Sequence, residues 1–277
     1  MPLPAAGFPL RPRSRPSSAA PVPLLLLLLC LSLFLGTWTR AAAAGDAVIL
    51  CYHRFGPTVA DSMTTRTSVF EEQLARLRAE GYQIVPLDAV VDGLAGRAPL
   101  PEKAVAITID DAHATVYSDV LPIIRRERLP VTLFVYPSAV SNASYAMTWE
   151  QLREIKDTGL VSIHSHTWWH PNFKTERKRL DDAAYAKLVK LQLEKPRAVL
   201  KQRLGADADV LAWPFGIHDP ELEAAAAAAG YRASLALGER RARSTDPAQA
   251  LPRFMVVDAV GVNGLAKRIA AQEEKPK

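Results

Sequence analysis

Short apolar runs alternate along most of the chain with stretches in which apolar residues recur at helical intervals. The apolar, largely β-branched runs predict strands at 47–53, 83–87, 104–109, 131–136, 160–163, 210–213, 233–237 and 254–257. The amphipathic stretches predict helices that begin near residues 68, 88, 115, 148, 181 and 221. Repeated β-α units of this length predict parallel strands covered by helices, in a barrel or an open sheet. Because seven or eight strands occur without a dinucleotide-binding fingerprint, we favour the α/β class with a (β/α) barrel, incomplete or distorted.

Local signals predict where several helices begin or break. Ser68-Val-Phe-Glu71 and Thr148-Trp-Glu-Gln151 both have the spacing of a capping box. Pro122 is expected near the start of its helix, or to kink it, because proline cannot donate the helical hydrogen bond. For the same reason, Pro196 is expected to interrupt the long charged helix over 181–203.

The first 44 residues have the parts of a secretory signal peptide. They contain four arginines, no acidic residue, an apolar run over 22–36 and small residues at 41–45. The run is shorter than the roughly 20 residues that a membrane-spanning helix needs. We therefore expect a cleaved signal over 1–44 and an exported bacterial protein, periplasmic or extracellular. An uncleaved N-terminal anchor is the alternative, and the membrane would be a partner only through that segment.

Composition changes once this segment is set aside. The formal charge of +5 reflects 34 basic and 29 acidic residues, and without the four N-terminal arginines 30 basic residues face the same 29 acids. This near balance gives no support for a nucleic-acid partner. One cysteine, Cys51, is left in an apolar run, so no intrachain disulfide can form and the residue is expected to pack as a small hydrophobe. We expect one domain over 45–267, a flexible tail over 268–277, and a monomer.

Two adjacent acids, Asp110 and Asp111, directly follow the apolar strand at 104–109. One interpretation is a helix N-cap, since Asp is favoured there and a helix is predicted to follow. The other is a functional pair, because neighbouring carboxylates at the end of a buried strand need a cation or a proton beside them. In a parallel barrel or sheet, the residues that follow the strands meet at the carboxyl edge. We therefore expect convergence of His53, Asp110, Asp111, Tyr136, 164–170 and 214–216.

His166 and His170 are four residues apart, a spacing that places both imidazoles on one side of a helical turn or a compact loop. Such a pair can be exposed or buried for structural reasons. Two histidines with one carboxylate from the Asp110-Asp111 pair, however, form the ligand set of a catalytic divalent-metal site. His164 is expected to point into the core and to orient a ligand rather than bind the metal.

Three ordered motifs carry a family resemblance. Thr108-Ile-Asp-Asp111 resembles the Thr-Phe-Asp-Asp motif of the polysaccharide deacetylases, the carbohydrate esterases with NodB homology. His166-Thr-Trp-Trp-His-Pro171 resembles their His-Ser/Thr-x-x-His-Pro motif, and Trp213-Pro-Phe-Gly216 resembles the end of their Arg-x-Pro-Tyr-Gly motif. The resemblance spans about 48–257. Tyr52-His53-Arg54-Phe55 and Leu251-Pro-Arg253 look most like the deacetylases of poly-β-1,6-N-acetylglucosamine, a biofilm polymer.

The resemblance implies a metal-dependent hydrolase that removes acetyl groups from an N-acetylglucosamine polysaccharide. Asp111, His166 and His170 would hold one divalent metal, zinc by expectation, although cobalt or nickel suits the same ligands. Asp110 would be the general base, and the backbone N–H of Phe215 would bind the oxyanion. Within the enzyme class, chitin oligosaccharides and peptidoglycan are alternative substrates. A non-catalytic polysaccharide-binding relative is the alternative outside it.

The chain departs from the family pattern at three places. The arginine that orients the catalytic Asp is Ala212, and we expect Arg253 to replace it from another strand. The glycine that often follows the two acids is Ala112. No histidine follows His218, so the usual late general acid is missing.

Amide hydrolysis must protonate a departing amine, so another acid is needed. Among the remaining histidines, His53 is predicted at the carboxyl end of the first strand, and we assign it this role. The alternative is a buried structural histidine that is hydrogen-bonded to the loop beginning at Gly56. Trp168 and Trp169 are the candidates for stacking on sugar rings, although we expect at least one of them to pack, since buried Trp is common in such cores. Trp168 and Trp213 are the candidates for substrate binding.

Overall fold

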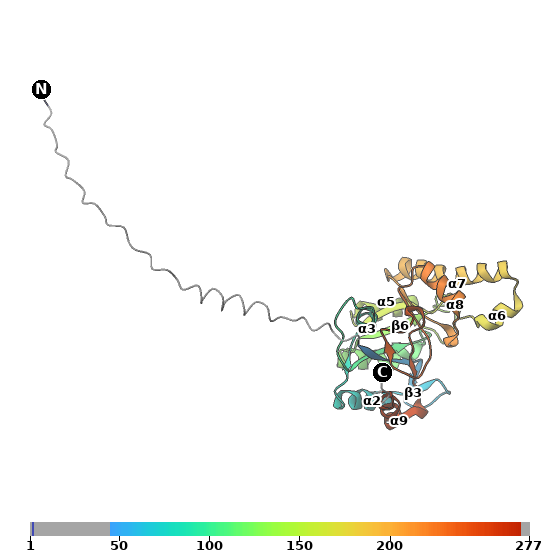
Figure 1. Cartoon of the computed structure of the whole chain (residues 1–277). Coiled ribbons are helices and arrows are strands. Elements are labelled where there is room, and N and C mark those ends of the chain that lie inside the picture. The colour runs from blue at the N-terminus through green and yellow to red at the C-terminus, as the bar shows by residue number, and fades with distance from the viewer. Residues whose placement is uncertain (1, 3–44, 273–277) are drawn as a thin grey trace. The chain divides into compact units, whose positions relative to one another are not determined.

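A computed structural model describes residue 2 and residues 45–272 of the protein (Figure 1). The signal-peptide prediction over 1–44 therefore falls outside the described residues, apart from residue 2, and so do residues 273–277. The chain divides into two units, 1–41 and 42–277, and every element below belongs to the second. In the described part of the chain, none of the helices combines the length and the apolar character needed to cross a bilayer.

A curled sheet of mainly parallel strands forms the centre of this unit. Six strands follow one another in space in the order β1 Asp46–Tyr52, β5 Ala104–Ile109, β6 Val131–Val135, β7 Val161–Ser165, β8 Val210–Ala212 and β9 Ala233–Leu235. β10 (Ala242–Arg243) pairs antiparallel with the start of β1, and β4 (Gln83–Ile84) pairs with the start of β5. The short strands β2 (Arg54–Gly56) and β3 (Thr64–Arg66) form a separate parallel pair.

The barrel is incomplete because its last strand is short and interrupted. β11 (Phe254–Met255) pairs in parallel with Leu50 and Cys51 of β1. On the other side, the same segment reaches β9 through a single bridge between Leu251 and Leu235. The segment 251–255 thus lies between the first and last strands of the sheet and places Arg253 at the seam. This arrangement confirms the predicted class, an α/β fold with an incomplete barrel.

The two faces of the sheet have different packing partners. Leu50, Ile107, Leu133 and Ile163 pack in one cluster with side chains from the surrounding helices. Residues next to them along the strands, including Ile49, Ala106 and Phe134, belong to a second cluster on the other face. Alternate residues of a strand point to opposite faces, so the strands are buried on both sides. This explains why their sequences are continuous apolar runs.

The helices are α2 Thr67–Ala79, α3 Leu87–Leu94, α4 Leu121–Glu127, α5 Trp149–Asp157, α6 Phe173–Arg179, α7 Asp182–Leu204, α8 Pro220–Ala228 and α9 Gly261–Ala270. A π-helical turn, Val116–Val120, precedes α4, and three short 3₁₀ turns cover Pro214–Gly216, Ala248–Ala250 and Asp258–Val260. Helices α2 and α9 lie side by side, far from each other in the sequence (Figure 1).

Several predicted helix ends differ from the structure. The capping box at Thr148 is confirmed, with both reciprocal hydrogen bonds present. The box at Ser68 is wrong, since α2 already begins at Thr67 and its N-cap Arg66 makes no side-chain cap bond. The expected interruption at Pro196 is also wrong, because α7 continues through it with buried residues on both sides of the proline. Packing outweighs the lost hydrogen bond there. Helix α9 ends at Ala270, so the predicted tail from 268 begins too early.

Candidate active site

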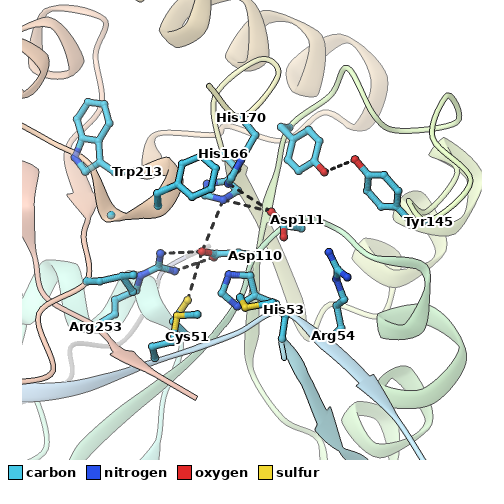
Figure 2. A pocket seen from close by; sticks show the side chains of 16 residues that line it. Cys51, His53, Arg54, Asp110, Asp111, Tyr145, His166, His170, Trp213 and Arg253 are labelled. Atoms are coloured by element: carbon cyan, nitrogen blue, oxygen red, sulfur yellow. Dashed lines mark hydrogen bonds and ion pairs between the residues drawn. The ribbon is translucent and has the colours of Figure 1, made fainter. Parts of the chain in front are cut away.

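The residues at the carboxyl ends of the strands enclose a cavity of about 590 Å³. Its walls come from β1, β5, β6, β7, the turn after β8, and the closing segment. The lining side chains include His53, Asp110, Asp111, Tyr136, Tyr145, His166, His170, Phe215, Leu237 and Arg253. The predicted convergence at this edge is therefore correct for His53, Asp110, Asp111, Tyr136, His166, His170, Phe215 and Gly216, whereas 164–165, 167–169 and Pro214 do not line the cavity. Figure 2 shows the two acids and the two histidines facing one another across the cavity.

Asp111, His166 and His170 form a compact group of potential ligands. Asp111 Oδ1 lies 3.6 Å from His166 Nε2 and 3.8 Å from His170 Nε2 (Figure 2). The three atoms lie within 4.8 Å of one another. A tetrahedral zinc site needs Zn–N and Zn–O distances of about 2.0–2.2 Å, which separates neighbouring ligand atoms by about 3.3–3.6 Å. The three side chains are therefore close to the arrangement that a divalent ion requires.

The protonation states of this group also suit a metal. Burial raises the pKa of Asp111, and its Oδ1 is buried without a hydrogen-bond partner within residues 45–272. Burial lowers the pKa of His166 to about 3, so this imidazole is neutral near pH 7. A neutral imidazole and an unpartnered carboxylate oxygen are the forms that bind a divalent cation. The residues present fit such an ion.

His166 is oriented by the main chain. Its Nδ1 lies 2.8 Å from the carbonyl oxygen of Ala212, which can only accept, so Nδ1 carries the proton and Nε2 faces Asp111 with its lone pair. The ring of His164, in contrast, does not face Asp111. It accepts the backbone N–H of Val210 and faces Asp88 and Asp209, both 3.7 Å away. The prediction that His164 orients a ligand is therefore wrong, because its ring contacts these groups and does not line the cavity.

Unusual backbone angles direct the two acids to different partners. Asp111 and Ala112 have φ angles of 72° and 53°, in the left-handed region. Asp tolerates this region, whereas Ala prefers to avoid it, and the family's glycine at the second position would adopt it freely. The turn sends Asp111 toward the histidines and leaves Asp110 at the end of β5, where its N–H donates to Tyr52 O at 2.9 Å. Neither acid is a helix N-cap.

Asp110 is held by Arg253, as the sequence predicted from the loss of the family arginine. The guanidinium donates to both carboxylate oxygens at 2.8 Å, and both side chains are buried (Figure 2). Burial opposes ionisation of Asp110, but the charge and the hydrogen bonds of Arg253 outweigh it and hold the pKa of the carboxyl far below its usual range. Arg253 also donates to Thr108 Oγ1 at 3.1 Å. Asp110 is therefore an ionised carboxylate in a fixed orientation.

Cys51 is more than a packing residue. Its thiol donates to Asp110 Oδ2 at 3.4 Å, and burial raises its pKa well above the usual value, so it stays protonated. No sequence pattern indicates this contact, which depends on the register of β1 beside β5.

His53 lies on the opposite side of Asp110 from Arg253, at the end of β1 (Figure 2). Its Nδ1 is buried and has no hydrogen-bond partner among the described residues. Burial lowers the pKa of the imidazole, and the charges of Asp110 and Asp111 act against that shift. The alternative was a structural histidine that is hydrogen-bonded to the loop at Gly56, and Nδ1 makes no such hydrogen bond.

Phe215 occupies the turn after β8 with a φ of 58°, which is rare for a bulky residue. Its ring is 59% exposed and packs edge-on against His170 with 4.6 Å between centroids. Gly216 follows with a φ of 65°, and a Cβ there would lie 3.0 Å from Leu237. Strained backbone of this kind is common at active sites, and both Phe215 and Gly216 line the cavity.

Of the two tryptophans predicted to bind substrate, Trp213 borders the cavity and Trp168 does not. Trp213 is fully buried, packs against Phe173, and donates from Nε1 to the carbonyl of Gln249 at 2.9 Å. A stacking role for Trp213 is therefore wrong, because the ring belongs to the core. The Lys195 ammonium lies 3.8 Å from the ring centroid of Trp168, which does not line the cavity. One face of that ring is thus already covered.

Two wall residues, Arg54 and Tyr145, were missed by the sequence reasoning. The hydroxyls of Tyr136 and Tyr145 lie 2.6 Å apart, and Tyr145 is 42% exposed. Tyr145 comes from the loop between β6 and α5, which has no strand-end position to mark it. Arg54 forms an ion pair with Asp61 beside the same cavity. For Arg54, the only signal in the sequence was its position directly after His53.

An incomplete barrel thus carries, at the carboxyl ends of its strands, a group of side chains that could hold a metal ion. Residues 97–234 match the family model described as polysaccharide deacetylase. Over these residues, about half of the chain, the protein therefore matches the polysaccharide deacetylase family. It superposes on the structure of IcaB from Ammonifex degensii with a TM-score of 0.69 and 26% identity, covering 81% of this chain and 97% of that one. The Streptococcus pyogenes deacetylase PplD, in complex with acetate, has the same fold, with a TM-score of 0.71 at 20% identity.

Two curated relatives have the same name. Poly-beta-1,6-N-acetyl-D-glucosamine N-deacetylase of Escherichia coli (strain K12) is 26% identical over 263 residues, covering 82% of this chain. The chain spans only 39% of the length of that relative. The protein of that name from Staphylococcus aureus (strain MRSA252) is 23% identical over 196 residues, which cover 69% of this chain and 67% of the relative.

Proposed function

We propose that the protein is a metal-dependent N-deacetylase of an N-acetylglucosamine polysaccharide, of the poly-β-1,6-linked type. The observation that carries the proposal is that two groups of side chains, a set of metal ligands and a fixed carboxylate, lie next to each other in one cavity. Asp111, His166 and His170 present three ligand atoms to one point, and Asp110, clamped by Arg253, lies beside them. His166 Nε2 is 3.8 Å from Asp110 Oδ2, so the ligand group and the Asp110 carboxylate are neighbours.

The three ligands would hold one divalent ion, for which zinc is the first candidate and cobalt or nickel would suit the same donors. When bound, such an ion supplies Lewis-acid polarisation of the acetamide carbonyl and makes water acidic enough to attack near neutral pH. Asp110 accepts the proton of the attacking water, and Arg253 keeps its carboxylate ionised and aimed at the cavity. The Phe215 N–H would bind the developing oxyanion.

Bond cleavage then needs a proton for the amine. Attack of water on the carbonyl carbon forms the new C–O bond, and breaking the C–N bond releases acetate and a free amino group on the sugar. His53 stands across Asp110 from Arg253 and would donate that proton to the leaving nitrogen (Figure 2). Because burial lowers its pKa, the protonated form of His53 is the minor one at neutral pH.

The polymer is proposed from the named relatives together with the cavity. Both curated relatives are called poly-β-1,6-N-acetylglucosamine N-deacetylases, and the IcaB structure is 26% identical over most of the chain. A cavity of about 590 Å³ is of the size that holds one or two sugar units. The predicted signal over 1–44 agrees with a substrate outside the cytoplasm, in the periplasm or beyond. We propose a monomeric exported enzyme.

Acetate release from a small panel of polymers tests the proposal. Purified protein, loaded with zinc or cobalt, is incubated with oligomers of β-1,6-linked and β-1,4-linked N-acetylglucosamine and with peptidoglycan. The expected result is fastest release from the β-1,6 oligomer, with loss of activity after chelation. Preference for either other polymer would overturn the substrate. No acetate from any of them, in protein shown to hold metal, would favour the non-catalytic polysaccharide-binding relative.

A further inference from the structure

The loop that carries both histidine ligands is tied to the rest of the protein through its backbone N–H groups. Residues 166–170 connect the end of β7 to the segment before α6, and both Thr167 and His170 have φ angles near 65°. Two left-handed residues within four positions, neither of them glycine, cost free energy unless other contacts fix the loop. The partners of these N–H groups therefore show what holds the ligands in place.

Side-chain oxygens accept four consecutive N–H groups of the loop. Thr167 N–H donates to Ser165 Oγ and His170 N–H donates to Thr167 Oγ1, each at 3.2 Å. These two bonds stay within the loop. The two between them, from Trp168 and Trp169, both go to Gln192 Oε1 at 3.0 and 3.1 Å. Gln192 is the acceptor through which these two N–H groups bind another element, helix α7.

Gln192 is an unusual residue for its place. It is fully buried, on a face of α7 whose other buried members include Tyr185, Val189 and Leu193. Its Nε2 is buried without a partner among the described residues. Burying an amide and leaving its donor unsatisfied costs free energy, and an apolar side chain would avoid that cost. The Oε1 of Gln192 explains why a polar residue is buried here, because without it the N–H groups of Trp168 and Trp169 would lack a hydrogen-bond partner.

We propose that Gln192 is a positioning residue of the metal site, which fixes the 166–170 loop so that His170 faces Asp111. The inference rests on the metal site of the proposed function and adds to it a residue from outside the three motifs. Gln192 contacts neither the cavity nor the ligands. It acts through the two backbone N–H groups directly before His170, whose Nε2 lies 3.8 Å from Asp111 Oδ1. Substituting Gln192 should therefore make the position of His170 relative to Asp111 less fixed, while all three metal ligands stay in the chain.

Equilibrium binding of Co²⁺, followed by its visible absorption spectrum, separates positioning from general stability. Gln192→Met keeps the length of the side chain and removes the acceptor, and we expect it to weaken Co²⁺ binding about 10-fold or more and to alter the spectrum. Gln192→Glu keeps acceptor oxygens and should bind nearly as the unchanged protein does. Val189→Ala is the matched control, since it is buried on the same helix and makes none of these hydrogen bonds. It should lower the unfolding temperature but leave affinity and spectrum unchanged.

Wild-type affinity and spectrum in Gln192→Met would overturn the inference, and so would equal weakening in Val189→Ala. If Gln192→Met does not fold, hydrogen exchange on the unchanged, metal-free protein decides the question. The Trp168 and Trp169 amides should exchange as slowly as those of β7, and fast exchange at both would overturn it. Absence of any Co²⁺ binding by the unchanged protein is a different result, which would overturn the proposed metal site itself.

Discussion

Arg253 and Asp110 lie 143 positions apart in the sequence and form a buried, two-pronged ion pair with both distances at 2.8 Å. The pair joins the closing segment of the barrel to the end of β5. A planar guanidinium can match both carboxylate oxygens at once, whereas an ammonium can match only one. The orientation of the proposed base thus depends on the shape of the cation as well as on its charge.

Arg253→Lys should therefore lower kcat about 10- to 100-fold while metal content stays the same. The lysine keeps a positive charge near Asp110 but frees one carboxylate oxygen to rotate. Acetate release at saturating metal and substrate measures the effect. Arg268→Lys is the matched control, since Arg268 forms an exposed pair with Glu239 and should tolerate the change. An Arg253→Lys variant with the original kcat would show that the orientation of Asp110 is unimportant.

The roles of the two adjacent acids and of the ligand histidines can be separated by metal analysis. His170→Ala should lose both metal and activity, because it removes one of three ligands. Asp110→Asn should keep most of the metal and lose most of the rate, since it removes a base while its amide oxygen can still accept from Arg253. His113→Ala, outside the ligand group, is the control. If Asp110→Asn loses the metal and Asp111→Asn keeps it, the two roles are reversed.

His53→Ala is expected to fold and bind metal normally while kcat falls by about 10²–10⁴, the range typical for loss of a general acid. The unpartnered Nδ1 indicates that removing the ring breaks no hydrogen bond at that atom. Circular dichroism, metal analysis and acetate release from β-1,6 oligomers together make the measurement. Wild-type rates in a folded, metal-loaded His53→Ala protein would remove His53 from the mechanism.

The metal-free protein should become less stable in mild acid. His166 has a pKa of about 3 in the folded protein because of its burial, against about 6.5 when unfolded. Between these values the unfolded chain binds a proton that the folded one does not, so stability falls as the pH drops below about 6.5. One such proton contributes up to about 1.4 kcal/mol per pH unit.

Urea unfolding of chelator-treated protein between pH 4.5 and 8.5 tests this dependence. His166→Asn should unfold with a smaller change across the acidic range, because the titrating group is gone. Above about pH 7.5 the two proteins should show the same pH dependence, which serves as the internal control. Identical slopes below pH 6.5 would mean that the pKa of His166 is close to its usual value in the folded state.

Local sequence was enough to predict the central parallel strands and the groups that follow them, but not the short strands β2, β3 and β10. Apolar runs gave β1, β5, β6, β7 and β8, since a strand buried on both faces has few other compositions available. Strand direction then placed Asp110, Asp111, His166 and His170 at one edge. The loss of the family arginine at position 212 even led to Arg253, because a buried carboxylate needs a cation from some other part of the chain.

Tertiary structure decided which of these side chains actually meet, because facing and burial depend on packing that no short segment contains. His164 and His166 differ by two positions on one strand, yet the first faces Asp88 and Asp209 and the second faces the cavity. Trp213 looked available for a sugar and is fully buried. Gln192 looked like an ordinary polar residue of a charged helix. Only the docking of α7 against the histidine loop makes its oxygen the shared acceptor of two N–H groups.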